Sequence, residues 1–323
     1  MRKNTILRTG CILLCCMSMV TGCSAFSKLE QPYELAERAA FLESGLSSGK
    51  AESFAHDLCV ITDDTPAVDS SLTAEAAAVF DVTDGSAIFG RNAFERLYPA
   101  SVTKVMTALL AVKYGNLADE VTVTEDAVIT ESGATLCGIK PGDKLTMEEL
   151  LYGLMLPSGN DAGAAIAVHM DGSMEKFAER MNEEAKSLGA TGSHFVNPHG
   201  LNDDNHYTTA YDLYLIFNEA MKYPDFMKVI GEKSYTAEYT DAEGKAVTKT
   251  WKATNWYMTG ERQMPEGLTV LGGKTGTTKA AGNCLILGSE DKNGGQYISV
   301  VLKAPDRKGL YENMTNILNK IVD

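Results

Sequence analysis

The sequence predicts a mixed α/β protein of the α+β kind, in which an antiparallel sheet flanked by helices carries an inserted, mostly helical subdomain. Strand-like runs occur near both ends of the chain, at residues 76–90 and 284–302, whereas apolar residues at helical spacing dominate the middle. Strands from the first and last thirds are therefore expected to pair, with the helices between them forming the insertion. With 323 residues, of which 44% are hydrophobic, the chain is long and apolar enough to bury such a core.

The first predicted elements are a hairpin and a helix. Residues 76–81 form an apolar run typical of a buried strand, turn-forming residues follow at 83–86, and residues 87–90 form the return strand. Between residues 102 and 112, apolar side chains recur every three or four positions, which predicts an amphipathic helix.

The remaining elements follow in chain order. Helical spacing predicts helices at 146–154, 161–170, 174–188 and 208–221, and strands are predicted at 235–239, 247–251, 284–288 and 296–302. A last helix begins near residue 308, and its apolar stripe is expected to lie on the sheet.

The chain is acidic, because 29 Lys and Arg residues face 43 Asp and Glu residues and the formal net charge is −14. Negative charge repels phosphate backbones and anionic lipid surfaces. Nucleic acid is therefore not expected as a partner, and any attachment to a membrane must depend on something other than charge.

The N-terminal segment has the features of an export signal. Basic residues occur near the start, and the apolar run at residues 11–20 is about half as long as a membrane span. Residues 20–24, VTGCS, resemble a bacterial lipobox, in which a small residue precedes a cysteine that is lipidated and becomes the new N-terminus. We therefore predict a lipoprotein signal peptide at residues 1–22 and lipidation of Cys23. The alternative is an ordinary secretory signal in which Cys23 has no role.

Residues 23–72 are predicted to be a partly disordered tether, because they contain Gly/Ser-rich and turn-forming stretches, and the folded domain is predicted at residues 73–323. Three thiols, Cys59, Cys137 and Cys284, remain after signal removal and lipidation, so at most one disulfide can form. Since no Cys-x-x-Cys pair occurs among them, neither a structural zinc site nor a redox motif is indicated.

A Ser-x-x-Lys spacing places Ser101 at the opening of the predicted helix, with Lys104 one turn on and on the same side. A helix N-terminus offers unpaired N–H groups and a favourable dipole to developing negative charge. The same spacing at 47–50 and 289–292 falls in the tether and in a hairpin turn. The structural alternative is that Ser101 only caps the helix.

A second polar segment, LPSGND at residues 156–161, lies between two predicted helices, so Ser158 and Asn160 project from a loop held by packed elements. The structural alternative is a polar turn in which Asn160 or Asp161 caps the next helix.

A third segment, GGKTGTT at residues 272–278, follows an apolar run. Its glycines let a backbone approach a ligand closely, and Lys274 supplies positive charge beside Thr275. The structural alternative is an exposed edge strand.

The motifs Ser-x-x-Lys, Ser-x-Asn and Lys-Thr-Gly occur here in the order found in penicillin-binding proteins and serine β-lactamases. The sequence resembles the serine D-Ala-D-Ala carboxypeptidases, the low-molecular-mass penicillin-binding proteins, and the segments at 195–201, 206–212 and 280–285 extend the resemblance over about residues 75–320. The resemblance implies a β-lactamase/transpeptidase-like fold. It also implies removal of the C-terminal D-alanine from peptidoglycan pentapeptide stems without a metal or cofactor, and inhibition by β-lactams.

The resemblance also implies roles for individual residues. Ser101 attacks and forms an acyl-enzyme, and Lys104, kept neutral by burial and by the like charge of Lys274, accepts its proton. Ser158 relays a proton to the departing D-alanine. Asn160 holds the peptide and supports Lys104 by hydrogen bonding.

Binding of the reacting groups is implied at the Lys-Thr-Gly segment. Lys274 and Thr275 would bind the free C-terminal carboxylate, which explains selectivity for the chain end. Backbone N–H groups of Ser101 and Thr277 would stabilise the oxyanion.

Two features depart from the family pattern. An Arg near the last strand often helps to hold the carboxylate, but our register places Leu310 there, with Arg307 and Lys308 close by, and leaves open which of them takes part. Many relatives carry a second β-rich domain and a C-terminal amphipathic anchor. Here the lipid on Cys23 is expected to replace that anchor, holding the domain at the outer face of the cytoplasmic membrane in the cell-wall space. No oligomeric state is predicted.

Three alternatives follow from the same residues. A serine β-lactamase needs a Glu-oriented water, yet residues 186–205 contain no Glu and Ser-Gly-Asn replaces the expected Ser-Asp-Asn. A non-catalytic lipoprotein that binds penicillin or wall peptide is the second. A zinc peptidase is the third, but no His-Glu-x-x-His motif accompanies the candidate ligands His194, His199, His206 and Asp212.

Overall fold

The computed structural model describes residues 58–322. The predicted signal peptide, Cys23 and most of the predicted tether lie outside the described residues. The strands are β1 (Ala76–Asp81), β2 (Ser86–Arg91), β3 (Glu120–Thr122), β4 (Lys144–Thr146), β5 (Ser234–Thr240), β6 (Ala246–Lys252), β7 (Leu268–Thr278), β8 (Gly282–Asp291) and β9 (Gln296–Ala304). The helices are η1 (Ala100–Thr103), α3 (Lys104–Tyr114), η2 (Glu125–Ala127), α4 (Met147–Met155), α5 (Asn160–Asp171), α6 (Met174–Ser187), α7 (Ala210–Met221), α8 (Pro224–Gly231), α9 (Trp256–Thr259) and α10 (Arg307–Val322).

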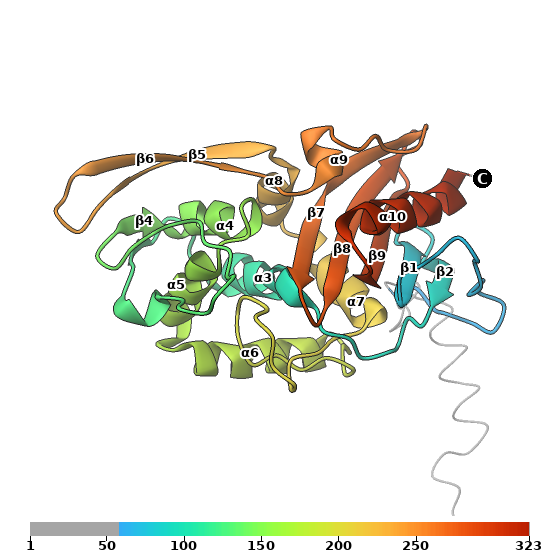
Figure 1. Ribbon diagram of the computed structural model, residues 1–323, viewed down its shortest axis with the longest axis horizontal. Coiled ribbons are helices and arrows are strands. Elements are labelled where there is room, and N and C mark those ends of the chain that lie inside the picture. Colours follow the sequence, from blue (N-terminus) through green and yellow to red (C-terminus); the bar gives the residue numbers. More distant parts are fainter. Residues whose placement is uncertain (1–57, 323) are drawn as a thin grey trace, which may run out of the picture. The chain divides into compact units, whose positions relative to one another are not determined.

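The main sheet joins strands from both ends of the described chain. Its five strands run in the order β2-β1-β9-β8-β7, and every neighbouring pair is antiparallel. The pairing of β1 with β9, in which Ala76 faces Leu302, confirms that the first and last thirds build one sheet. Strand β7 forms one edge of this sheet, and this edge faces the helical subdomain (Figure 1).

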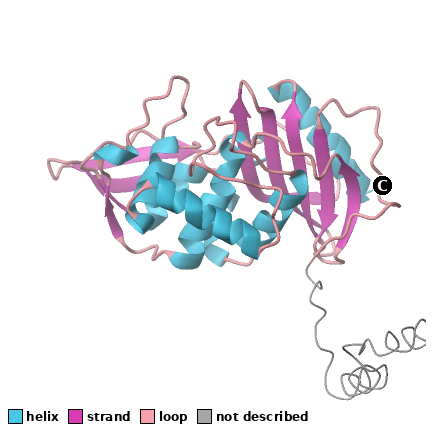
Figure 2. Cartoon of the chain, turned by 90° about the horizontal axis from the view of Figure 1, so that it is seen from below, coloured by secondary structure: helices cyan, strands magenta, loops and turns pink. Residues whose placement is uncertain are grey.

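The two faces of the main sheet are covered by helices from different parts of the chain. Helix α10 packs on one face through an apolar stripe that includes Leu310, Met314 and Ile317, as predicted. Helix α7 packs on the other face, where the larger core extends into the helical subdomain. Figure 2 shows the sheet beside the group of helices that makes up this subdomain. Because both faces are covered, nearly all of β8 and β9 is buried.

A second sheet, with the strand order β3-β4-β5-β6, belongs to the helical subdomain and is not predicted as a separate sheet by the sequence. The strands predicted at 235–239 and 247–251 form its long hairpin, β5–β6, which extends away from the main sheet (Figure 1). Only Ala237 and Tyr239 are buried along β5, so this strand lacks the apolar side chains that an interior strand of the main sheet requires. The short strands β3 and β4 and helix α8 are further elements that were not predicted.

Residues 58–72, which fall within the predicted tether, pack against the domain. The side chain of Cys59 is fully buried, its N–H donates to the Tyr214 hydroxyl at 2.8 Å, and its carbonyl accepts from the Tyr211 hydroxyl at 2.9 Å. Polar turn composition indicated a tether here, but two tyrosines of α7 hold the segment down. All three described cysteines are buried free thiols. Within residues 58–322, no helix is both long and apolar enough to cross a membrane.

Candidate active site

Ser101 lies in the 3-10 turn η1, directly before α3, so the predicted helix opening is confirmed. The residue before it, Ala100, has a positive φ of 49°, which is strained for a side chain with a Cβ. Gly200 packs against this turn, and only glycine fits there, because a Cβ at this position would lie 1.8 Å from the Ala100 carbonyl oxygen. The strained turn is therefore held in place by contacts from outside its own helix.

A buried histidine also supports this turn. His206 Nδ1 accepts the N–H of Val196 at 3.1 Å, so the ring proton is on Nε2, which donates to the Thr103 hydroxyl at 2.8 Å. Thr103 in turn donates to the Ala100 carbonyl at 2.8 Å. The neutral ring thus connects the loop at residue 206 to the residue that precedes Ser101.

This histidine predicts acid lability of the fold. Burial lowers the pKa of His206 from 6.5 to about 4. On lowering the pH, the unfolded chain takes up a proton at this histidine before the folded protein does. The free energy of unfolding is therefore unaffected by His206 above pH 6.5 and falls as the pH drops towards 4, by up to about 3 kcal/mol. We expect the melting temperature of His206→Gln, which keeps a donor towards Thr103, to fall less over this range than that of the wild type. The part-exposed His169→Gln is the control, and equal declines in both variants would refute the prediction.

Lys104 Nζ is surrounded by three oxygen atoms. It lies 2.9 Å from Ser101 Oγ, 2.6 Å from Asn160 Oδ1 and 2.7 Å from the His199 carbonyl oxygen. The side chain is completely buried. Burial holds the pKa of Lys104 well below its usual range, the positive charge of Lys274 lowers it further, and the negative charge of Asp161 acts in the opposite direction.

A neutral amine matches these three contacts. A neutral lysine has two N–H donors and one lone pair. Asn160 Oδ1 and the His199 carbonyl can only accept, so they take the two N–H groups. The lone pair is then left for the hydroxyl proton of Ser101. The geometry therefore supports Lys104 as a base rather than as a buried cation.

Ser158 lies in the loop between α4 and α5 and has a positive φ of 69°. Its Oγ accepts from Lys274 Nζ at 2.9 Å. Asn160 is the first residue of α5 and the N-cap is Gly159, so Asn160 does not cap this helix. The Asp161 carboxylate does accept one first-turn N–H, that of Ala162, at 3.0 Å. The loop instead presents Ser158 towards β7 and Asn160 towards Lys104.

Lys274 lies on β7, the edge strand beside the helical subdomain. Burial, together with the smaller effect of the Arg307 charge, lowers its pKa to about 7. Its amine also donates to the Thr275 carbonyl at 2.9 Å. A Cβ at Gly276 would lie 2.8 Å from the Ser101 nitrogen, so only glycine lets β7 pass this close to the nucleophile turn. The Lys-Thr-Gly segment is thus both an edge strand and part of the cleft.

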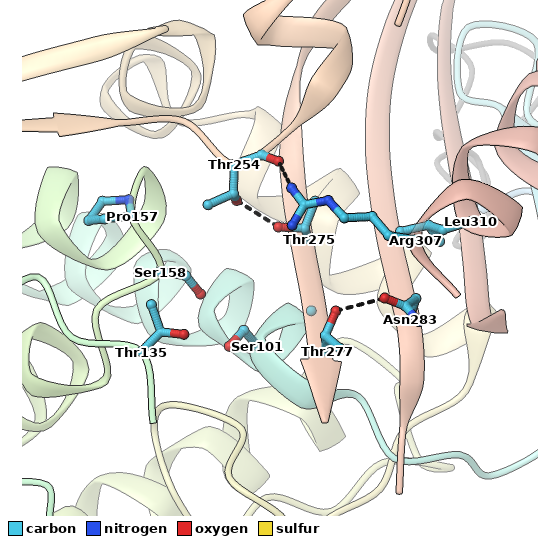
Figure 3. Close-up of a pocket in the computed structure, with 11 residues that line it drawn as sticks. Ser101, Thr135, Pro157, Ser158, Thr254, Thr275, Thr277, Asn283, Arg307 and Leu310 are labelled. Atoms are coloured by element: carbon cyan, nitrogen blue, oxygen red, sulfur yellow. Dashed lines mark hydrogen bonds between the residues drawn. The ribbon is translucent and has the colours of Figure 1, made fainter. Parts of the chain in front are cut away.

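The three motifs meet at a cleft in which Ser101 separates two cavities. In Figure 3, Ser158 and Thr135 lie on one side of Ser101, and Thr275 and Thr277 of β7 lie on the other. The first cavity, of about 130 Å³, is the one drawn there. The second, of about 310 Å³, is lined by Ser101, Thr135, Asn160, Gly200, Thr277 and Lys279 among others.

Lys274, which the sequence predicts to bind the substrate carboxylate, is not among the residues that line the first cavity. Thr275 lines the first cavity, but Lys274 lies behind it, where its amine contacts Ser158 and the Thr275 carbonyl. Lys274 therefore acts on the cavity by its charge and through these two neighbours. Its completely buried amine cannot turn towards the ligand without losing both contacts.

Arg307 and Lys308, between which the sequence did not choose, lie in different surroundings. Arg307 lines the first cavity and donates to the Thr254 carbonyl at 2.7 Å, whereas the side chain of Lys308 is 84% exposed and pairs with Glu312. The hydroxyls of Thr254 and Thr275 lie 2.7 Å apart. Leu310, the residue at the expected register, also lines the cavity.

Three residues that line the first cavity were not anticipated. Thr135 and Thr254 belong to loops with no motif, so nothing in the sequence marks them. Asn283 lies next to Thr277 on the neighbouring strand and accepts from its hydroxyl at 3.1 Å. It falls within the resembling segment at 280–285, which is the signal that pointed to it.

The histidines of the zinc alternative make contacts with the protein. His206 holds Thr103, as described above, and the His199 carbonyl accepts from Lys104. Among residues 58–322, no three His, Cys, Asp or Glu side chains gather as metal ligands would.

Comparisons with known proteins agree with this geometry. A model of the D-alanyl-D-alanine carboxypeptidase family matches residues 60–306. The D-alanyl-D-alanine carboxypeptidase DacF of Bacillus subtilis is 34% identical over 252 residues, which are 76% of this chain and 61% of DacF. The D-alanyl-D-alanine carboxypeptidase DacC of Escherichia coli is 33% identical over 271 residues, covering 80% of this chain and 64% of DacC. The chain spans about three fifths of the length of these relatives.

A solved structure has the same fold. The Streptomyces K15 DD-transpeptidase superimposes with a TM-score of 0.72 at 30% identity, covering 78% of this chain and 98% of that one. This similarity confirms the predicted β-lactamase/transpeptidase-like fold.

Proposed function

Because the chain belongs to the D-alanyl-D-alanine carboxypeptidase family, we propose that it removes the C-terminal D-alanine from peptidoglycan pentapeptide stems through an acyl-enzyme on Ser101. One observation carries the proposal. The buried Lys104 amine lies 2.9 Å from Ser101 Oγ, and its two other oxygen contacts leave its lone pair for the Ser101 proton. These contacts support Ser101 as the nucleophile and Lys104 as its base.

In the first step Ser101 Oγ attacks the carbonyl carbon of the penultimate D-alanine while Lys104 takes the hydroxyl proton. The carbonyl oxygen becomes an oxyanion. The close approach of β7 at Gly276 brings the backbone of Thr277 beside the Ser101 nitrogen, which supports a site made of these two N–H groups.

Collapse of this intermediate breaks the peptide bond. The Ser158 hydroxyl accepts a hydrogen bond from Lys274, so its own proton is free to point into the cleft towards the leaving amine. We therefore assign Ser158 a relay role, in which it gives its hydroxyl proton to the departing D-alanine and regains the proton that Lys104 took from Ser101. Water then hydrolyses the ester on Ser101 and releases the shortened stem peptide.

The terminal carboxylate is assigned to the first cavity. Thr275 and Arg307 line it, and Lys274 adds positive charge from behind. This cavity holds only about 130 Å³, which suits a single small residue. The larger cavity on the other side of Ser101 is then left for the acyl part of the stem.

The Arg307 guanidinium predicts a pH effect on substrate binding. Lys274 loses its proton as the pH rises through about 7, so KM for an acyl-D-Ala-D-Ala peptide should increase above that pH. Arg307→Gln removes a like charge and raises the pKa of Lys274, so the increase should start at higher pH, while KM at pH 6 rises about tenfold through loss of a charged partner. Lys308→Gln is the control. An increase in KM at the same pH in all three proteins would contradict this assignment.

We further propose that β-lactams acylate Ser101 and remain bound. The described residues that line the two cavities include no Asp or Glu, so no carboxylate there activates water for fast deacylation. The test mixes the pure protein with a fluorescent penicillin, a chromogenic β-lactam and a pentapeptide. Stoichiometric labelling and release of D-alanine that survives EDTA support the proposal. Rapid multiple turnover of the β-lactam supports a β-lactamase, and labelling without D-alanine release supports a binding protein.

Anchoring to the outer face of the cytoplasmic membrane through a lipid on Cys23 is also part of the proposal. It is supported by the lipobox-like residues 20–24, which follow the apolar run. In bacterial cells fed labelled palmitate, the full chain should carry label and sediment with membranes. Cys23→Ser should do neither, whereas Cys16→Ser, seven residues earlier in the chain, should behave as the wild type. Label on Cys23→Ser would rule the anchor out.

A further inference from the structure

The carboxylate of Asp161 is buried next to the catalytic groups, although none of the reaction steps uses it. Its side chain is 3% exposed, and Oδ1 accepts the N–H of Ala162 in the first turn of α5 at 3.0 Å. Both carboxylate oxygens also contact the connection between η2 and β4. There Oδ1 accepts the N–H of Cys137 at 2.8 Å, and Oδ2 accepts the N–H groups of Gly138 and Ile139 at 2.7 Å and 3.2 Å. Three consecutive backbone donors thus converge on one carboxylate.

The connection held in this way forms one wall of the cleft. Thr135, two residues before the first of these donors, lines both cavities, and its carbonyl accepts the N–H of Asn160 at 2.8 Å. Figure 3 shows Thr135 beside Ser158, across Ser101 from β7. A shift of this wall would therefore move Thr135 and the Ser158–Asn160 loop together.

The fit between wall and loop leaves no spare space. A Cβ at Gly159 would lie 2.7 Å from Asp161 Oδ1, 2.7 Å from the Cys137 Cβ and 2.7 Å from the Gly153 carbonyl oxygen. The loop that carries Ser158 in its strained conformation is therefore clamped between α4 and the wall. The carboxylate is the group that joins the two surfaces.

We propose that Asp161 is a positioning residue of this active site, whose carboxylate fixes the wall at 135–139 and places negative charge near the Lys104 amine. The proposal rests on the function proposed above and assigns Asp161 a part in it. The amine is also faced by Lys274 from β7, by His199 from the loop after α6 and by Cys137 from the wall. Among these groups Asp161 is the carboxylate, so its removal leaves the charge of Lys274 unopposed.

The decisive measurement is the pH dependence of acylation by fluorescent penicillin. Acylation requires neutral Lys104, so its rate falls on the acid side where Lys104 becomes protonated. Asp161→Asn removes the charge and turns one acceptor into a donor that opposes the N–H groups. We expect the maximal acylation rate of this variant to be lower than that of the wild type. We also expect the acid limb, the pH range over which the rate falls as Lys104 gains its proton, to lie about one pH unit lower. A residue with a purely structural role would lower the rate without moving the limb.

Two further variants separate charge from geometry. Asp161→Glu keeps the charge but displaces the carboxylate, so its rate should fall with the acid limb unmoved. Asp143→Asn is the matched control, because Asp143 is also buried and accepts the N–H of Lys140 at 2.9 Å, but in the turn before β4. It should match the wild type in both rate and limb. If Asp161→Asn does not fold, Asp161→Glu provides the test. Acylation of Asp161→Glu by fluorescent penicillin at the wild-type rate would then overturn the proposal.

Amide hydrogen exchange supplies a readout that does not depend on activity. The amides of residues 137–139 should exchange faster in Asp161→Asn than in Asp143→Asn or the wild type. Unchanged exchange or an unmoved acid limb in folded Asp161→Asn overturns the proposal. A wild type that neither binds penicillin nor releases D-alanine defeats the proposed function instead, while the exchange experiment still tests the role of the carboxylate in the wall.

Discussion

Ser101→Ala will abolish labelling by fluorescent penicillin and release of D-alanine together. Both reactions require the same oxygen to form an ester, and no second hydroxyl replaces it. Ser158 is the other serine nearest to the reaction, but its Oγ accepts from Lys274 rather than facing Lys104. Because Ala retains the Cβ and η1 is held by contacts at Ala100 and Thr103, the melting temperature should change little. Mass spectrometry of the protein after incubation with penicillin is the measurement.

The sequence provides a matched control for this variant. Ser289 begins another Ser-x-x-Lys spacing, but it lies in β8, and its buried hydroxyl has no hydrogen-bond partner among the described residues. Ser289→Ala should therefore acylate and release D-alanine at the wild-type rate. Loss of only one activity in Ser101→Ala would mean that the two reactions use different nucleophiles, and the proposed mechanism would be wrong.

Local patterns in the sequence predicted most of the fold. The hairpin β1–β2 and helices α3 to α7 follow from apolar periodicity, and this signal is carried by residues that are neighbours in the chain. The second sheet was missed because membership of a sheet is not a local property. Strands β4 and β5 are joined by the single residue pair Lys144 and Thr240, which no periodicity reveals.

In the active site, too, the features carried by residues close together in the chain were predicted, and those that depend on contacts between distant segments were not. The three motifs were predicted to converge, and the contacts from Lys104 to Asn160 and from Lys274 to Ser158 bring them together. The motifs did not predict which of these side chains are buried or what they contact there. Burial places Lys274 behind Thr275, and it gives Asp161 three backbone partners in a segment whose residues carry no motif. Such contacts depend on how distant segments pack, so composition and spacing did not predict them.

Lys104→Arg will lower the rate of acylation by about a thousandfold at pH 7, within the range that general-base catalysis contributes. A guanidinium keeps its proton in proteins, so it has no lone pair to offer the Ser101 hydroxyl. The replacement also buries a permanent charge where burial and Lys274 now favour a neutral amine. The variant should therefore melt at a lower temperature than the wild type.

The pH profile distinguishes loss of the base from loss of folding. In the wild type, acylation falls on the acid side as Lys104 gains a proton. In Lys104→Arg that limb should disappear, because no group titrates at this position, and the rate constant of acylation should be low at every pH. Partial unfolding alone would reduce the amplitude of labelling without lowering the rate constant of the molecules that remain folded. Lys104→Met tests the same point without a buried charge and should show the same loss of rate. Lys292→Arg, from the other Ser-x-x-Lys spacing, should acylate normally. A folded Lys104→Met variant that acylates within tenfold of the wild type would show that another group accepts the Ser101 proton.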